Sequence, residues 1–212
     1  LMSKAIKIKI LDSKLSNVSS VKNMINWVGH EATIVRNLNE VIDGDRIILP
    51  GIGNFGKAMN YLKHHGLEDQ IHEIANRKKN PILGICLGMQ LFMNESEESP
   101  GIKGLGLIDG SVKKFNFKNE QLKIPHVGWN TLDLLNENPI FNNFNKAQSR
   151  YYFVHSYFVN CKNSENVLSK TNYGLTFDSA IFKENIYGFQ FHPEKSLKHG
   201  ANLIKNFCEM KF

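Results

Sequence analysis

The sequence predicts an α/β protein built on a mainly parallel sheet with antiparallel additions. Strand-like and helix-like segments alternate through the first half of the chain, which is typical of βαβ units. A buried strand leads directly into a helix at residues 82–94, and the second half is richer in strand patterns. With 212 residues and 42% hydrophobic content, the chain is long enough for one sizeable core, so we expect one domain over residues 1–212.

Hydrophobic periodicity defines the expected elements. In the first half, three strands are indicated by isoleucines that alternate with lysines or by short apolar runs. Three helices are indicated by apolar residues that recur at helical spacing. The strands are expected over residues 5–11, 30–35 and 46–49, and the helices over 20–28, 55–64 and 68–79. The later elements are a strand over 82–85, a helix over 87–94, strands over 105–117, 123–127, 130–135, 151–159 and 180–191, and a helix over 197–210.

Composition restricts the classes of function. The net charge is +6, but the lysines are spread along the chain, and the short basic runs are more typical of solvated element ends than of a nucleic-acid surface. No apolar stretch reaches the roughly 18 residues that a membrane helix needs, and the N-terminal residues do not resemble a secretory signal. The cysteines Cys86, Cys161 and Cys208 cannot all pair, and none has zinc-finger spacing. We therefore expect a cytoplasmic protein that holds no metal and binds neither nucleic acid nor membrane.

The segment Gly84-Ile85-Cys86-Leu87-Gly88 has the spacing of a nucleophile elbow, with a thiol in place of the usual hydroxyl. The glycines are expected to let the chain turn sharply and to leave room over the nucleophile. The start of the following helix favours the ionised thiolate, which is the form that attacks carbonyl carbon. A lone cysteine in an apolar run is usually a small core residue. Glycines on both sides, at a strand-to-helix junction, favour the nucleophile instead.

A glycine-flanked loop, Pro50-Gly51-Ile52-Gly53, follows the third expected strand. The carboxyl ends of parallel strands share one edge of a sheet, so this loop and the elbow are expected to open onto the same site. One N–H of the loop and the amide of Leu87 would then form an oxyanion hole. The alternative is a plain turn that ends a strand, which this short motif alone does not exclude.

A strand that ends at His192-Pro193-Glu194 supplies the candidate base. Pro193 stops the strand at once, so both His192 and Glu194 are expected on a loop beside one pocket. A nucleophilic thiol needs an imidazole to move its proton, and the imidazole needs an acceptor that fixes its tautomer. His192 and Glu194 match these roles. His126 and His155, which lie in expected strands, are the rival histidines.

These motifs resemble the class I, or triad-type, glutamine amidotransferases. Within that family, further segments resemble the glutaminase subunits of imidazole glycerol phosphate synthases, and the similarity extends from about residue 6 to residue 207. The resemblance implies the three-layer, flavodoxin-like fold of the family and no cofactor. The segments that carry it are Gly84 to Gln90, Pro50 to Gly53, Pro125-His126-Val127-Gly128-Trp129-Asn130, Tyr152-Phe153-Val154-His155-Ser156-Tyr157 and Gln190-Phe191-His192-Pro193-Glu194-Lys195-Ser196.

The resemblance implies that L-glutamine is hydrolysed to glutamate and ammonia. Cys86 would attack the side-chain amide, His192 would shuttle the proton, and Glu194 would orient His192. The amides of Ile52 and Leu87 would hold the oxyanion. The family's remaining substrate-binding positions match Gly51, Gln90, Ser156 and Tyr157.

The resemblance also implies a partner. Ammonia would pass directly to a synthase (cyclase) subunit, a (β/α)₈ barrel in a heterodimer, which forms imidazole glycerol phosphate and AICAR in histidine biosynthesis. Direct transfer avoids dilution and protonation of the ammonia. The residues expected at the interface are Lys14, Asn17, Trp129 and Lys195. Trp129 would be an aromatic anchor and Lys195 an interface cation; the alternatives are a core tryptophan and a solvated loop charge.

One segment departs from the subfamily pattern. Members usually have D-x-G-x-G-N after the first strand, whereas this chain has Asp12 and Asn17 with Lys14 and Ser16 at the glycine positions. Either Lys14 meets an acidic group on the partner or the loop is reshaped. The same glutaminase chemistry serving another synthase, such as a surface-sugar amidotransferase, is therefore an open alternative. A non-catalytic regulatory subunit and a cysteine peptidase are further alternatives.

Overall fold

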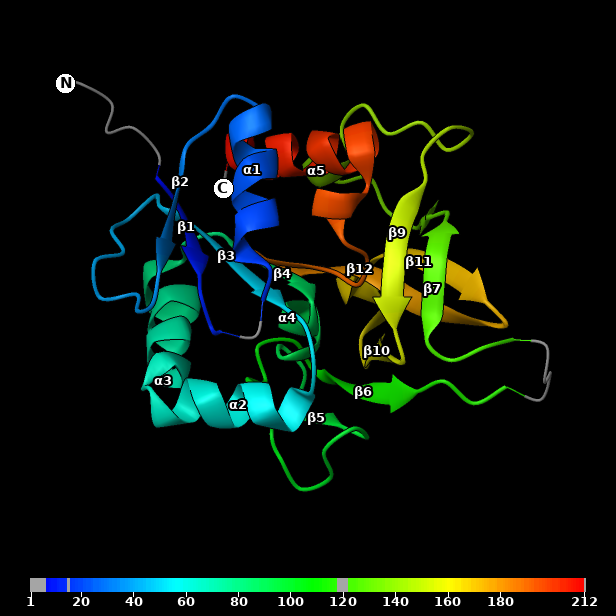
Figure 1. The fold of residues 1–212 in the computed structure, drawn as a ribbon, viewed down its shortest axis with the longest axis horizontal. Helices are drawn as coiled ribbons and strands as arrows, with labels where there is room; N and C mark the ends of the chain where they lie inside the picture. The colour runs from blue at the N-terminus through cyan, green and yellow to red at the C-terminus, as the bar shows by residue number, and fades with distance from the viewer. Residues whose placement is uncertain (1–6, 15, 118–121, 212) are drawn as a thin grey trace.

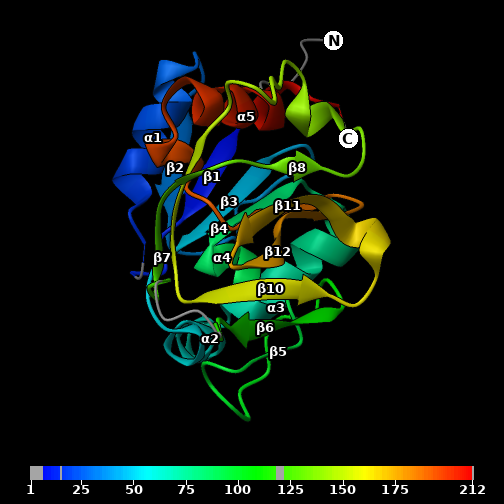
Figure 2. The same cartoon turned by 90° about the vertical axis from the view of Figure 1, so that its right-hand side faces the viewer.

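A central sheet lies between two layers of helices in the computed structural model, which describes residues 7–14, 16–117 and 122–211 (Figure 1). Helices α1 (Val18–Trp27) and α5 (Leu197–Glu209) cover one face. Helices α2 (Phe55–His64) and α3 (Leu67–His72) cover the other, as Figure 2 shows from the side. The predicted α/β class is confirmed. Among the described residues, no helix is both long and apolar enough to cross a membrane.

The sheet is parallel on one side and, apart from a short parallel pair of strands at its far edge, antiparallel on the other. Its strands follow the order β2, β1, β3, β4, β13, β12, β10, β6, β5, and neighbours from β2 to β13 are parallel. The parallel strands are β2 (Ala32–Val35), β1 (Ile8–Leu11), β3 (Arg46–Gly51), β4 (Ile82–Cys86) and β13 (Ile186–Phe189). The remaining strands are β12 (Leu175–Lys183), β11 (Val167–Tyr173), β10 (Tyr157–Cys161), β8 (Asp133–Leu134), β6 (Gly110–Lys114) and β5 (Glu95–Ser96), and a separate hairpin-like pair consists of β7 (His126–Asn130) and β9 (Tyr151–His155).

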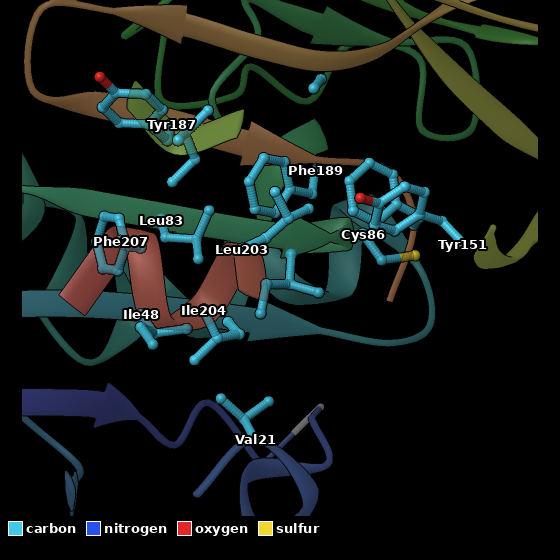
Figure 3. Packing of buried hydrophobic residues seen from close by; sticks show 14 of the residues in the cluster. Val21, Ile48, Leu83, Cys86, Tyr151, Tyr187, Phe189, Leu203, Ile204 and Phe207 are labelled. Carbon is cyan, nitrogen blue, oxygen red and sulfur yellow. The ribbon is translucent and has the colours of Figure 1, made fainter. Parts of the chain in front are cut away.

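Alternation along the buried strands builds two hydrophobic clusters, one on each face. On β3, Ile48 packs in the cluster under α1 and α5, whereas Ile47 and Leu49 pack in the cluster over α2 and α3. Figure 3 shows the first cluster, to which β4 contributes Leu83 and α5 contributes Leu203, and Cys86 lies at the edge of the group that is drawn. The parallel strands are therefore buried on both faces, which is why their sequences are almost continuously apolar.

Register brings three loops to one edge of the sheet. Gly51 at the end of β3 is paired with Cys86 at the end of β4, and Phe189 of β13 is paired with Ile85. Because these strands are parallel neighbours, the segments that follow them leave the sheet side by side. The predicted convergence of the glycine loop, the elbow and the His192 loop is confirmed.

The helix predicted over residues 87–94 is wrong in length, because α4 (Leu87–Gln90) has only four residues. After Leu91 N–H donates to Leu87 O, the bonding pattern changes: Phe92 and Met93 donate only three residues back, to Met89 O and Gln90 O. Asn94 N–H donates to the distant carbonyl of Gly110 instead of continuing the helix. The helix predicted over 68–79 is α3 followed by a π-helix, Glu73–Lys78. Residues 5 and 6 of the first predicted strand lie outside the described residues.

Two predicted strands are each two strands. The segment 151–159 breaks at Ser156 into β9 and β10, which belong to different sheets. The segment 180–191 is the end of β12, a turn at Glu184 with φ 53°, and β13. Of the predicted strand 105–117, only β6 is a strand. The strands predicted over 123–127 and 130–135 are observed with shifted bounds, as β7 and β8. Strand β11 was not predicted.

Gly88 makes the tightest backbone contact of the elbow, so it offers a test of this packing. A Cβ atom on Gly88 would lie 1.8 Å from the carbonyl oxygen of Leu49 in β3. We expect Gly88→Ala to lower the free energy of unfolding by about 3 kcal/mol or more, because rigid backbone must move. Gly101→Ala is the control: its φ is +84° in open space, and the strain of about 1–2 kcal/mol is conformational only. Urea unfolding curves compare the two, and equal losses would contradict the steric argument.

Candidate active site

Cys86 has the strained backbone of a nucleophile elbow. Its φ is 54° and its ψ is −107°, a region that non-glycine residues rarely adopt and that persists where surrounding structure enforces it. The residue is 7% exposed. Its Sγ lies 3.6 Å from Nε2 of Gln190 and 3.9 Å from the carbonyl oxygen of Val154. The conformation thus presents the sulfur at the sheet edge, within reach of polar groups.

The elbow glycines act through close packing. A Cβ atom on Gly84 would lie 2.7 Å from the backbone of Gly88, and one on Gly88 would overlap the Leu49 carbonyl. The expectation that the glycines themselves turn the chain is corrected, because neither has a positive φ and the sharp turn falls on Cys86. The glycines let the turn after Cys86 lie directly on strands β3 and β4.

His192 and Glu194 are joined as predicted. Nδ1 of His192 lies 2.7 Å from Oε1 of Glu194, and both side chains are 3% exposed. Pro193 opens a short 3₁₀ turn that carries Glu194 back beside the ring. The loop is fixed by Ser196, whose Oγ donates to the His192 carbonyl at 2.6 Å, and by the His192 N–H, which donates to the Tyr152 carbonyl at 2.8 Å.

The electrostatics of His192 favour its charged form. Burial opposes an imidazolium, but the interactions of the ring with Cys86 and Glu194 outweigh it and raise the pKa of His192 to about 10. Nε2 of His192 is buried without a hydrogen-bond partner and belongs to the same cavity wall as Cys86. A proton on Nε2 is therefore available to a group bound in that cavity.

A cavity of about 270 Å³ lies over the thiol. Of the residues predicted to bind substrate or oxyanion, five line it and Gly51 does not, because Gly51 packs behind the loop against Leu87. The five are Ile52, Leu87, Gln90, Ser156 and Tyr157. Gly53, also on the wall, has φ +105°. The cavity has the size and polarity for a small amino acid.

Glu98 is a cavity residue that the sequence analysis missed. Its Oε2 accepts a hydrogen bond of 2.6 Å from the N–H of Phe55, and Ser99 Oγ accepts one of 2.9 Å from Gly56 N–H. Both caps fix the start of α2 and therefore the end of the loop that carries Ile52. Glu98 lies in a segment that resembles a polar loop, and nothing in its sequence pattern places a carboxylate in the cavity.

Gln190 is the second omission. Its Nε2 contacts the thiol, and its Oε1 accepts a hydrogen bond of 3.1 Å from Nε2 of Gln90, which also donates to the Tyr157 carbonyl at 3.0 Å. A signal for it was present in the sequence. Gln190 lies two residues before His192 at the end of the expected strand 180–191, and alternate residues of an extended chain share a face, so this spacing could have placed Gln190 beside the site.

The residues expected at an interface are exposed. Trp129 is 50% exposed, which excludes the alternative that it is a core residue. Its ring packs edge-on against Tyr152 at 5.8 Å, and Nζ of Lys195 lies 5.7 Å from the centre of the same Tyr152 ring. Lys14 and Asn17 are exposed at the start of α1, where Asn17 Oδ1 accepts a hydrogen bond from Ser20 N–H. Lys14 has φ 57°, the conformation that favours the glycine expected there.

The rival histidines are buried and serve another purpose. His126 and His155 are 2% and 6% exposed and lie side by side, with Nδ1 of His126 3.0 Å from Nε2 of His155. Burial lowers the pKa of His126 to about 4 and that of His155 to about 3. Neither carries charge at neutral pH. Among the described residues, no group of three or more His, Cys, Asp or Glu side chains is placed to hold a metal ion.

The family model described as "Glutamine amidotransferase class-I" matches residues 9–210. The chain belongs to the class-I glutamine amidotransferase family. It is 45% identical over 202 residues to "Imidazole glycerol phosphate synthase subunit HisH 2" of Methanococcus maripaludis, a match that covers 95% of this chain and 98% of the relative. It is 43% identical over 203 residues to the HisH subunit of Methanocaldococcus jannaschii, covering 96% and 99%. The resemblance stated from the sequence motifs and the enzyme class are confirmed.

Solved structures of glutamine amidotransferases share the fold. One crystal structure of a glutamine amidotransferase superimposes with a TM-score of 0.73 at 18% identity, covering 95% of this chain and 97% of that one. The structure of PurLQS from Thermotoga maritima gives 0.72 at 20% identity, covering 95% and 96%. The three-layer glutamine amidotransferase fold implied by the resemblance is confirmed.

The buried histidine pair predicts how stability depends on pH. An unfolded histidine has a pKa of about 6.5, so the unfolded chain binds more protons than the folded chain as pH falls below that value. The free energy of unfolding should therefore fall on acidification, by roughly 2 kcal/mol per buried histidine at about pH 5. Urea unfolding at about pH 7 and pH 5 measures this loss. In His126→Phe, this pH-dependent loss should be smaller by roughly 2 kcal/mol, the contribution of one buried histidine. The control His64→Asn, at an exposed site, should show the same loss as wild type. Equal losses in wild type and both variants would contradict the assignment.

Proposed function

We propose that this chain is a glutaminase, which hydrolyses L-glutamine to glutamate and ammonia. The observation that carries the proposal is that Cys86 and His192 belong to one cavity wall while Glu194 holds the far side of the His192 ring. The thiolate of Cys86 attacks the side-chain amide carbon. The Nε2 proton of His192 goes to the amide nitrogen, ammonia leaves, and water then cleaves the thioester to release glutamate.

In this proposal, different residues bind the oxyanion and the amino-acid end of the substrate. The amides of Ile52 and Leu87, two residues of the cavity wall that also holds Cys86, stabilise the tetrahedral oxyanion. Gln90 and the backbone of Ser156 and Tyr157 hold the amino-acid end of glutamine. Glu98 is the carboxylate among the described residues of the cavity wall, and a carboxylate there is matched to the α-ammonium group of the substrate.

The proposed partner is a cyclase subunit of an imidazole glycerol phosphate synthase, because the relatives at 43% and 45% identity are named as HisH subunits of that synthase. In a heterodimer, a (β/α)₈ cyclase would receive ammonia directly and form imidazole glycerol phosphate and AICAR in histidine biosynthesis, in the cytoplasm. The chain would act as one amidotransferase domain. Trp129 and Lys195, which both contact Tyr152, are the proposed docking residues, together with Lys14 and Asn17.

The reaction is tested by measuring glutamate release. We expect little turnover by the purified chain alone and strong activation by a cyclase subunit with its nucleotide ligand, because that complex is the proposed working form. Cys86→Ala should abolish the activity, because it removes the nucleophile while the fold persists. No activation, with Cys86 still alkylated by a glutamine-like electrophile, would assign the glutaminase to another synthase. No activation and no alkylation would overturn the glutaminase proposal itself.

Glu98→Gln tests substrate recognition. The amide keeps an oxygen that can accept from Phe55 N–H but removes the charge that faces the α-ammonium group. We expect KM for glutamine to rise about 10- to 100-fold, the loss of affinity expected when a hydrogen bond to a charged group is removed, while kcat changes little. Glu97→Gln, one residue away on the exposed surface, is the matched control. An unchanged KM in Glu98→Gln would exclude the ammonium contact.

A further inference from the structure

A continuous chain of hydrogen bonds connects strand β7 to the nucleophile. Nδ1 of His155 lies 2.8 Å from the carbonyl oxygen of Tyr157, and Nε2 of the same ring lies 3.0 Å from Nδ1 of His126. That carbonyl also accepts from Nε2 of Gln90, which donates in turn to Gln190 beside the Cys86 thiol. At the other end, Nε2 of His126 lies 3.4 Å from Nδ2 of Asn130.

The groups at the two ends of this chain of hydrogen bonds determine which nitrogen of each imidazole carries a proton. A carbonyl oxygen only accepts, so His155 carries its proton on Nδ1, and its Nε2 must accept from Nδ1–H of His126. Nε2 of His126 is then a lone pair that faces the amide N–H of Asn130. The orientation of Asn130 is itself fixed, because its Oδ1 accepts from Thr131 N–H at 2.8 Å and its Nδ2 donates to the Asn172 carbonyl at 2.9 Å.

We propose that His126 and His155 form a positioning pair, which holds the Tyr157 carbonyl and Gln90 in place and thereby sets the affinity of the glutamine site. His155 belongs to the cavity wall, whereas His126 does not and acts through His155. The proposal rests on the glutaminase function proposed above. An imidazolium in either ring would place two N–H groups face to face at one of the contacts, so the arrangement requires both rings to be neutral.

The surroundings keep the pair neutral and rigid. His126 is stacked between Phe153 and Tyr173, with ring centroids 4.8 and 4.0 Å away. Phe177 contacts both imidazoles edge-on, and Phe115 contacts His155 at 5.2 Å. No charged side chain is hydrogen-bonded to either imidazole among the residues that the structure describes. Burial alone lowers the pKa of His126. The pKa of His155 is lowered mainly by burial and further by the electrostatic effect of the neighbouring His126 and His192.

A purely structural role makes a different prediction from a positioning role. In an aromatic cage, Phe is the better packing residue at position 126, and Asn is the poorer one because it leaves space and buries polar atoms. Asn, however, places an amide N–H near the position of the imidazole Nδ1–H and so keeps the donor to His155. If the pair positions the site, His126→Phe should therefore be the more stable variant, whereas His126→Asn should bind glutamine more tightly.

The experiment compares His126→Phe and His126→Asn in the activated complex. We expect His126→Phe to raise KM for glutamine roughly three- to tenfold, the size of one neutral hydrogen bond, with kcat little changed. His126→Asn should restore KM to within about twofold of wild type while unfolding at a lower temperature than His126→Phe. Tyr173→Phe is the control: it keeps the ring stack and removes only the hydroxyl that donates to the Lys123 carbonyl, so KM should not change.

A second measurement does not depend on activity. Nitrogen-15 NMR of the imidazoles should show His126 and His155 protonated on Nδ1 and neutral from about pH 6 to about pH 9. A KM order that follows the stability order, or a KM that is unchanged in both variants, would overturn the proposal, as would protonation of either ring on Nε2. A wild-type chain with no glutamine turnover and no Cys86 alkylation would instead overturn the glutaminase function, while the NMR result would still decide the hydrogen-bond chain.

Discussion

The contact between the elbow and strand β3 is the constraint on which the site depends. Gly88 lies so close to the Leu49 carbonyl that no side chain fits between them, and Gly84 is packed against Gly88 in the same way. This contact lets the first turn after β4 lie on the sheet and holds Cys86 at φ 54°. Parallel register then brings Gly51 and Phe189 level with the elbow. The strain at Cys86 is thus maintained by close packing of the turn against β3 and β4.

Burial has opposite consequences for the histidines of the site, and their partners explain the difference. The ring of His192 has a carboxylate on one side and the thiol on the other, so its charged form is stabilised in spite of desolvation. His126 and His155 have only neutral hydrogen-bond partners, and desolvation lowers their pKa values. One imidazole is therefore suited to carry a proton to substrate, while the other two are suited to hold geometry without changing charge.

The edge of the sheet that carries the nucleophile also carries the exposed aromatic surface. Tyr152 pairs with Trp129 across β7 and β9, and its carbonyl accepts from the backbone N–H of His192. Lys195, three residues after His192, lies over the same ring. A partner that docks on Trp129, as proposed, would therefore contact a strand that is hydrogen-bonded directly to the loop of the proposed base.

The sequence by itself determined the chemistry-bearing segments and most of the fold. The elbow, the loop at Ile52 and the His192–Glu194 pair were recognisable because glycine and proline spacing and strand periodicity are local properties. The tertiary structure decided what depends on contacts between distant segments. The helix stops short of Asn94 because the Asn94 N–H donates to the distant carbonyl of Gly110, and Ser156 divides a strand because its two halves join different sheets. Glu98, Gln190 and the His126–His155 pair acquire their places in the same way, since local periodicity does not specify which buried polar groups meet.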